Sequence, residues 1–210
     1  MKVLIACESS GVVREAFRTM GHDAWSCDLL PADDGSKYHI QGDCLVEAYS
    51  GYWDMMIAHP PCTYLCSSGL HWNHRVVGRH MLTLHALEFV KKLMAAPIEK
   101  ICIENPKGCI STHIRPADQY IQPYQFGEDA SKSTGFWLKG MPWLKMTKYI
   151  FPRTASGKPR WANQTDSGQN RLPPSADRWK ERSKTYQGIA DAMGSQWSEF
   201  QMPEQYGLAL

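Results

Sequence analysis

An apolar segment that ends on two prolines and a cysteine constrains this fold more than any other feature. Residues 54–62 read Asp-Met-Met-Ile-Ala-His-Pro-Pro-Cys, and the apolar run before the prolines is typical of a buried strand. Because proline lacks a backbone N–H, the chain must leave the sheet here. Cys62 is therefore expected on a rigid turn at the carboxyl edge of a sheet, where open α/β folds bind ligands. Taken alone, such a cysteine is more often a small buried hydrophobe.

The first 28 residues follow a strand, turn, helix and strand pattern. Residues 2–7 form an apolar strand, and Val12 to Met20 carry apolar side chains at helical spacing. The next strand closes on Asp28, about 20 residues past the first turn, as in nucleotide-type cofactor sites. That turn, residues 7–11, contains a single glycine, so a cofactor without a pyrophosphate fits better than NAD. A structural βαβ unit without a ligand explains this segment equally well.

Two further segments are expected to bring acidic side chains to the same edge. Asp43 closes a short third strand, and residues 100–106 form a strand that ends in Glu104 and Asn105. Beside an apolar strand, Glu104 would hold a raised pKa and act as an acid near neutral pH. A carboxylate that only caps the following turn is the competing interpretation. An amphipathic helix over Arg79 to Met94 precedes this strand, and its apolar set is Leu82, Leu84, Leu87, Phe89, Val90 and Leu93. The alternation of strands and helices predicts an α/β domain.

Positive charge is concentrated in one part of the chain. Residues 131–185 hold 12 lysines and arginines against 3 acidic residues, whereas the remainder holds 11 against 18. Tryptophans and tyrosines are interleaved with these charges, and aromatic rings can stack on bases. The pattern favours a nucleic-acid partner. A solvated basic segment without a partner remains the alternative.

The cysteines and the apolar runs bear on location and on metal binding. The 7 cysteines follow no spaced framework, which suits reduced thiols. No apolar run approaches the roughly 20 residues that cross a bilayer, so we expect a cytoplasmic protein without a membrane partner. Zinc is a competing chemistry, because residues 59–74 hold three histidines and two cysteines. Their spacing offers no Cys-x-x-Cys pair, and we expect no metal.

In their order along the chain, these residues resemble the DNA (cytosine-5) methyltransferases, which use S-adenosylmethionine. Pro60-Pro61-Cys62 resembles the Pro-Cys nucleophile motif of that family, with Gly69 at the position of its loop glycine. Residues 104–106, Glu-Asn-Pro, are similar to the Glu-Asn-Val motif whose glutamate contacts the target cytosine. Residues 186–190 are similar to the C-terminal motif that completes the cofactor pocket. The resemblance covers residues 1–140 and roughly 182–197.

The resemblance implies a fold, a division of the chain and a set of site residues. It implies a Rossmann-like S-adenosylmethionine-dependent methyltransferase fold, with a mixed, mostly parallel sheet and helices on both faces. Residues 1–140 would be the catalytic core, 141–181 a short basic target-recognition insertion, and 182–210 a C-terminal helix returning to the core. The implied catalytic residues are Cys62, Glu104 and Lys132. The implied cofactor-binding residues are Cys7, Glu8, Ser9, Gly11, Asp28, Asp43 and Pro60. The implied substrate-binding residues are Asn105, Pro106, Arg160, Trp161 and Arg171.

The implied reaction transfers a methyl group to carbon-5 of a cytosine that has been flipped out of duplex DNA. Three departures from the family pattern leave alternatives open. The cofactor loop lacks the family's glycine run, and the family's Gln-x-Arg-x-Arg motif would fall on Ala130, Lys132 and Thr134. The target-recognition region has at most about 40 residues, as in a compact, phage-like member. A homodimer or an auxiliary specificity subunit could then supply sequence readout. The alternatives are an RNA methyltransferase and a non-catalytic or zinc-bound nucleic-acid-binding protein.

Overall fold

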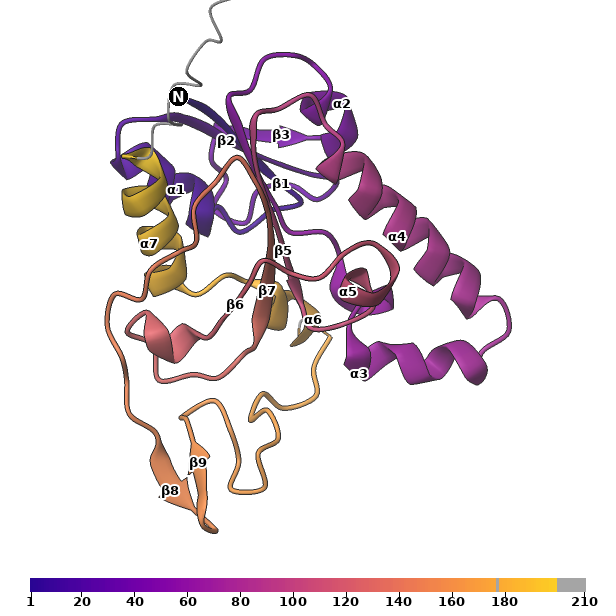
Figure 1. The fold of residues 1–210 in the computed structure, drawn as a ribbon, viewed down its shortest axis with the longest axis vertical. Coiled ribbons are helices and arrows are strands. Elements are labelled where there is room, and N and C mark those ends of the chain that lie inside the picture. Colours follow the sequence, from indigo (N-terminus) through magenta and orange to yellow (C-terminus); the bar gives the residue numbers. More distant parts are fainter. Residues whose placement is uncertain (177, 200–210) are drawn as a thin grey trace, which may run out of the picture.

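Seven strands pair into one mixed sheet in the order β3-β2-β1-β4-β5-β7-β6. The computed structural model describes residues 1–176 and 178–199 (Figure 1). The strands are β1 Lys2–Ala6, β2 Asp23–Asp28, β3 His39–Gln41, β4 Met55–Ala58, β5 Lys100–Pro106, β6 Gln119–Ile121 and β7 Thr134–Lys139. Only β7 runs against its neighbours. This order, with β7 reversed, is the Rossmann-like methyltransferase topology, and the predicted fold class is confirmed.

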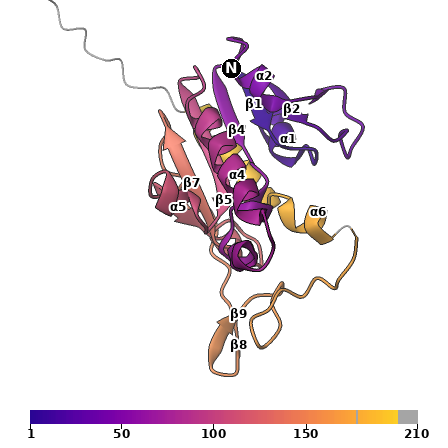
Figure 2. The same cartoon turned by 90° about the vertical axis from the view of Figure 1, so that its right-hand side faces the viewer.

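Helices cover both faces of the sheet (Figures 1 and 2). One face carries α1 Val12–Thr19 and α7 Gln187–Ser198, which pack against each other. The other face carries α2 Cys44–Ala48, α4 Arg79–Met94 and α5 Ile110–His113. The shorter helical turns are η1 Cys62–Tyr64, α3 Ser67–Leu70, η2 His71–His74, η3 Pro123–Gln125 and α6 Arg178–Ser183. Among the helices of the described residues, none is both long and apolar enough to cross a membrane.

The central strands are apolar along their whole length because both of their faces are covered. Residues 3–6 of β1 and all of β4 are fully buried. Alternate side chains of these strands enter two separate cores, one beneath α1 and α7 and the other beneath α2 and α4. β4 ends at Ala58 because Pro60 and Pro61 follow it and cannot donate to a ladder.

The helix predicted over Arg79 to Met94 is present, but its apolar face differs in the first turns. Leu87, Val90 and Leu93 are buried as expected. Leu82 and Leu84 are 43% and 50% exposed, because the N-terminal part of α4 extends past the edge of the sheet (Figure 1). The periodicity of the sequence cannot show where the sheet beneath a helix stops.

The basic segment 141–181 contains a hairpin that projects from one end of the molecule. Its strands are β8 Arg153–Ala155 and β9 Lys158–Arg160 (Figures 1 and 2). The side chain of Asn163 donates to the Ser131 carbonyl oxygen at 2.9 Å and accepts from the Ser131 N–H at 3.0 Å. We call residues 151–172 the arm. These two bonds tie the arm to the segment that leads into β7. Residues 200–210, part of the predicted C-terminal unit 182–210, lie outside the described residues.

Candidate active site

Three of the predicted catalytic residues meet at the carboxyl edge of the sheet. Cys62 begins the turn after β4, Glu104 lies near the end of β5, and Lys132 precedes β7. β5 and β7 are paired so that Pro106 lies opposite Thr134, which brings Lys132 to the same edge. The positive charge of Lys132 favours the ionised forms of both Cys62 and Glu104, although the hydrogen bond to Cys66 and burial leave the pKa of Cys62 raised. The structure therefore brings together side chains from three separate segments.

The turn that carries Cys62 is held by the strand beside it. The Asn105 side-chain amide donates to the Pro60 carbonyl oxygen at 2.7 Å, and the Cys109 N–H donates to the Leu65 carbonyl oxygen at 2.8 Å. Asn105 is 1% exposed, and its Oδ1 has no hydrogen-bond partner among the described residues. Pro60 and Asn105, both predicted site residues, thus fix the position of the Cys62 turn through backbone and amide contacts.

Replacing Gly108 with alanine is expected to lower the free energy of unfolding by about 1–3 kcal/mol. The added Cβ would lie 1.9 Å from the Leu65 carbonyl oxygen and 2.7 Å from the Cα of Cys66. Both atoms belong to the backbone that follows Cys62, so this segment would have to move. Urea denaturation measures the loss. Gly42→Ala is the matched control, because its Cβ would meet nothing within 4 Å. Equal losses in the two variants would contradict this account.

The Cys62 thiol is paired with a second thiol, that of Cys66. The two side chains share a hydrogen bond, and the Cys66 N–H donates to the Cys62 carbonyl oxygen at 2.9 Å. The hydrogen bond to Cys66 and burial raise the pKa of Cys62, against the effect of Lys132. The hydrogen bond from Cys62 lowers the pKa of Cys66, helped by the hydroxyl of Ser68 at 3.1 Å. The hydrogen bond between the two thiols therefore favours a negative charge on Cys66 over one on Cys62.

The Glu104 carboxylate lies among hydrogen-bond donors. His59 Nδ1 is 3.2 Å from Glu104 Oε2, and the two side chains are 10% and 12% exposed. The Thr134 hydroxyl also bonds the carboxylate. Burial raises the pKa of Glu104, but the His59 hydrogen bond and the charge of Lys132 outweigh it and hold this pKa below its ordinary value. The predicted raised pKa is wrong, because the sequence pattern showed the apolar strand and not these cations.

His59 is a site residue to which the sequence alone assigned no role in catalysis. Its N–H donates to the Ala6 carbonyl oxygen at 2.9 Å, which continues the β1–β4 ladder by one residue and fixes its orientation. Its Nε2 is buried and has no hydrogen-bond partner among the described residues. Its charge also acts on the carboxylate of Glu8. The available signal was its position, directly before the Pro-Pro-Cys turn and opposite the Glu104 strand.

On the cofactor side, Glu8 caps the first helix. Its carboxylate accepts from the N–H groups of Val13 and Arg14, at 2.8 and 3.2 Å, and from the hydroxyl of Ser10 at 3.2 Å. Burial raises the pKa of Glu8, while His59 and the helix N–H groups oppose this. At the start of a helix such an acid is stabilising. Glu8 stands where the family has its glycine run. Its side chain therefore folds back onto the protein.

The remaining turn residues are shaped by the side chain of Arg14. Gly11 has a φ of +73°, and a Cβ there would lie 2.2 Å from the Arg14 guanidinium. The buried guanidinium bonds Ser26 on β2 at 2.9 Å and also Asp34. The Ser9 carbonyl oxygen accepts from the Asp33 N–H at 2.9 Å. The buried guanidinium of Arg14 thus occupies the space beside Gly11, so only glycine fits at that position.

Acidic and sulfur side chains line the ends of β1, β2 and β3. Cys7 Sγ lies 3.4 Å from Cys44 Sγ. Asp28 Oδ1 accepts from the Leu30 N–H at 2.9 Å, and Asp43 Oδ1 accepts from the Leu45 N–H at 2.9 Å. Asp28 is half-buried and Asp43 is exposed. These carboxylate acceptors fit the ribose hydroxyls of a nucleoside cofactor.

The predicted substrate-binding residues lie in three different settings. Pro106 ends β5, and Arg171 is exposed on the arm. The Arg160 guanidinium donates to the Asp166 carbonyl oxygen at 3.0 Å within the arm. Trp161 is 8% exposed and stacks on Tyr124 at 4.2 Å between ring centroids. Trp161 therefore anchors the arm, and its predicted contact with the substrate needs correction because its ring face is already covered.

Exposed aromatic side chains do occur around the arm at other positions. Trp143, Phe151 and Trp179 are 64%, 82% and 60% exposed. Phe151 lies next to Tyr149, with ring centroids 5.1 Å apart. These rings, rather than that of Trp161, are free to contact a partner. Spacing between basic residues identified the segment, but could not tell which of its rings face outward.

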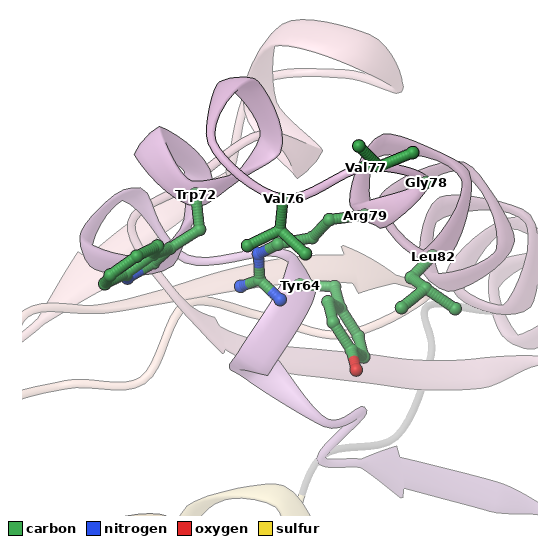
Figure 3. A pocket seen from close by; sticks show the side chains of 7 residues that line it. All are labelled: Tyr64, Trp72, Val76, Val77, Gly78, Arg79 and Leu82. Carbon is green, nitrogen blue, oxygen red and sulfur yellow. The ribbon is translucent and has the colours of Figure 1, made fainter.

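A groove of about 610 Å³ lies beside the loop that follows Cys62 (Figure 3). Arg79 crosses it, with its guanidinium 4.7 Å from the Tyr64 ring centroid, and donates to the carbonyl oxygens of Thr63 and Gly69 at 3.1 and 3.2 Å. The groove is lined by Tyr64, Trp72, Val76, Val77, Gly78, Arg79 and Leu82. Arg79 thus supports the Cys62 loop from outside the catalytic cluster.

The zinc alternative is not supported by the described part of the chain. Within residues 1–176 and 178–199, no group of three or more histidine, cysteine or acidic side chains is arranged to hold a metal ion. The histidines and cysteines of residues 59–74 are spread over several turns, with Cys62 in η1 and both His71 and His74 in η2.

This chain resembles known proteins in structure but not in sequence. No family model matches this chain, and no curated protein is significantly similar to it in sequence. Among the solved structures that match is a candidate DNA modification methyltransferase encoded within a prophage of E. coli. It has 14% sequence identity and a TM-score of 0.41, and the match covers 65% of this chain and 45% of that one. This chain thus spans less than half the length of that protein. The strand order described above, and not this likeness, identifies the fold.

Proposed function

We propose that this protein transfers a methyl group from S-adenosylmethionine to carbon-5 of cytosine in DNA. The observation that carries the proposal is the meeting of Cys62, Glu104 and Lys132 at the carboxyl edge of a methyltransferase-type sheet. A nucleophile, a carboxyl group and a cation are the groups needed to make carbon-5 of a cytosine reactive. The division into a catalytic core and a DNA-contacting segment, residues 141–181, belongs to the same proposal.

The cofactor would lie across the ends of β1 to β4. S-adenosylmethionine supplies an electrophilic methyl group on a positively charged sulfur. Asp28 would accept hydrogen bonds from its ribose, Asp43 would lie near its adenine, and the turn of Cys7, Ser9 and Gly11 would border its methionine part. Pro60, buried beneath the Cys62 turn, would close the other side. Glu8 would contribute through helix capping, because its carboxylate is already satisfied by backbone donors.

The chain's own residues would activate the base. Cys62 passes its proton to Cys66, and the resulting thiolate adds to carbon-6 of the cytosine, forming a carbon–sulfur bond. The ring electrons move toward nitrogen-3, where a proton from Glu104 neutralises the developing charge. Lys132 stabilises the thiolate before attack. After methyl transfer, water takes the carbon-5 proton, and expulsion of the Cys62 thiolate restores the aromatic ring. The thiolate then takes its proton back from Cys66.

DNA would be held by the arm and by the residues around Asn105 and Pro106. A base stacked in a duplex cannot reach Cys62, so the cytosine must be flipped out. Arg171 and Lys158 are exposed on the arm, where phosphate groups can approach them. The Arg160 guanidinium donates a hydrogen bond to another residue of the arm, and it would contact the DNA from that position. A short arm of this kind supports relaxed readout, or readout shared with a second copy or another subunit.

Replacing Lys158 and Arg171 together with glutamine is expected to weaken DNA binding and its dependence on salt. Each phosphate contact that is lost lowers the slope of log affinity against log salt by about 0.9. Fluorescence anisotropy with a duplex, measured between low and moderate salt, gives this slope. Lys92→Gln, an exposed site on α4, is the control and should leave the slope unchanged. An unchanged slope in the double variant would exclude the arm from the interface.

The deciding experiment incubates the protein with tritiated S-adenosylmethionine and DNA. Label at carbon-5 of cytosine supports the proposal, and label in RNA but not DNA would favour an RNA methyltransferase. A second candidate, a nucleic-acid-binding protein without catalysis, is favoured by one observation: Glu8 fills the N-terminal end of α1 with negative charge. Calorimetry with S-adenosylmethionine separates the two, because the second candidate predicts that no heat of binding is seen.

A further inference from the structure

We propose that His59 supplies, through Glu104, the proton that the target cytosine takes up at nitrogen-3. This inference rests on the proposed function and adds a residue to its mechanism. His59 does not touch the base in this account, so it is a positioning and proton-supplying residue for Glu104. The observations behind it are the His59–Glu104 contact, the burial of both side chains and the unpaired Nε2.

The contact between the two side chains defines where the proton sits. An ionised carboxylate has only acceptors, so His59 must present a hydrogen at Nδ1 to the Glu104 oxygen 3.2 Å away. The imidazole cannot turn away easily, because its backbone is fixed to Ala6 and its side chain is 10% exposed. The hydrogen on Nδ1 is therefore directed at Glu104.

Glu104 needs a source of protons before it can act as an acid. The pKa of Glu104 is held below its ordinary value, so the carboxylate is ionised at neutral pH. In that state it can accept but cannot donate to nitrogen-3 of the base. Among the groups near Glu104, Thr134 contributes a neutral hydroxyl and Lys132 an ammonium that ordinarily releases its proton only near pH 10. Histidine is the side chain whose proton is exchanged near neutral pH.

Acidic groups from several segments place negative charge around His59. Glu104 faces it from β5, and Glu8 faces it from the turn after β1. Lys132, before β7, opposes this through its positive charge near Glu104. The Cys62–Cys66 pair, on the turn after β4, adds one negative charge to the same edge. His59 is thus surrounded by two acidic side chains and the Cys62–Cys66 pair, with one ammonium near Glu104.

The proton moves from His59 through Glu104 to nitrogen-3 as the adduct forms, and it returns by the same route as the adduct breaks down. As the Cys62–carbon-6 bond forms, Glu104 gives a proton to nitrogen-3 and takes the Nδ1 proton of His59. His59 is left as neutral imidazole with its hydrogen on Nε2, the nitrogen that has no protein partner among the described residues. When Cys62 is expelled and the ring regains its aromatic state, nitrogen-3 returns the proton to Glu104, and Glu104 returns it to Nδ1.

The test compares the pH dependence of single-turnover methyl transfer in the wild type and in His59→Gln. Formation of the Cys62 thiolate makes the rate rise with pH, and loss of the His59 proton makes it fall again at higher pH. Glutamine can still donate a hydrogen bond to Glu104 but has no proton to give up. His59→Gln should therefore be slower by about tenfold or more at neutral pH and should lack the alkaline fall. An alkaline limb that persists unchanged in this variant would overturn the proposal.

A second measurement does not depend on activity. NMR follows the ring of His59 as the pH is changed, with His59→Gln used to assign its signal. Replacing Glu104 with glutamine should move the His59 titration to lower pH, because a carboxylate that favours the imidazolium has gone. An unmoved titration would show that the pair does not share a proton and would also overturn the proposal. Wild-type protein that labels no DNA at any pH would instead refute the proposed function itself.

Discussion

Replacing Cys62 with serine is expected to reduce methyl transfer to cytosine by about 10³-fold or more. Serine keeps the size of the side chain and can still form a hydrogen bond to Cys66. Its hydroxyl has a pKa far above that of a thiol, so the attacking anion is not formed near neutral pH. The measurement is single-turnover transfer of tritium from S-adenosylmethionine to DNA. Because Cys62 is half-buried on an ordered turn, the substitution should leave folding intact.

A covalent trap tests the same residue by a different route. When fluorine replaces hydrogen at carbon-5 of the target cytosine, no proton can leave, and the cysteine adduct should persist through denaturation. Wild type and Cys102→Ala, which removes a buried thiol of β5 facing the α1–α7 core, should both form it. Cys62→Ser should not. Mass spectrometry that finds the adduct on Cys66, or equal activity in Cys62→Ser, would contradict the assignment of the nucleophile.

The fold was predictable because its strongest signals are local. The run Met55–Ala58 stops before two prolines, and Asp28 follows the first turn at a fixed distance, so the carboxyl edge of the parallel sheet could be inferred. Reversal of β7 was not visible, since an apolar segment such as Thr134–Lys139 has the same pattern in either direction. The resemblance to a known family, and not periodicity, supplied the mixed sheet.

The meeting of Cys62, Glu104 and Lys132 could be inferred from strand ends, but its electrostatics could not. Proximity in a parallel sheet follows from topology, because the carboxyl ends of neighbouring strands share one edge. The pKa of Glu104 depends on His59 and Lys132, which are 45 and 28 positions away in sequence. Sequence patterns describe which face of a strand is apolar. They do not describe which charges another segment brings to its end.

The two surprises at the site both involve side chains that fold back on the protein. Glu8 replaces a glycine run and was expected to border the cofactor, but its carboxylate caps α1. Trp161 was expected to face DNA, but it stacks on Tyr124. In each case a polar or aromatic side chain in a predicted loop contacts another part of the same chain. Composition can place such a residue in a functional segment without showing which way it points.

Replacing Glu104 with glutamine is expected to slow methyl transfer by about 10²- to 10⁴-fold, the usual range for removing a general acid. Glutamine fills the same space and can accept from His59, but it cannot pass a proton to nitrogen-3. The affinity for S-adenosylmethionine, measured by calorimetry, should not change, because Glu104 lies on β5 and the proposed cofactor edge is formed by β1 to β4. Glu88→Gln, an exposed acid on α4, is the control and should keep full activity.

The same substitution has a signature in stability. The pKa of Glu104 is lower in the folded protein than its ordinary value of 4.5, so the ionised carboxylate stabilises the fold at neutral pH. This contribution is fully present above pH 4.5 and disappears as the pH falls through the lowered folded pKa. Urea denaturation should therefore show Glu104→Gln as less stable than the wild type at pH 7, with the difference shrinking on acidification. A difference that grows as the pH falls would mean that Glu104 is protonated in the folded protein. Direct donation to the base would then need no help from His59.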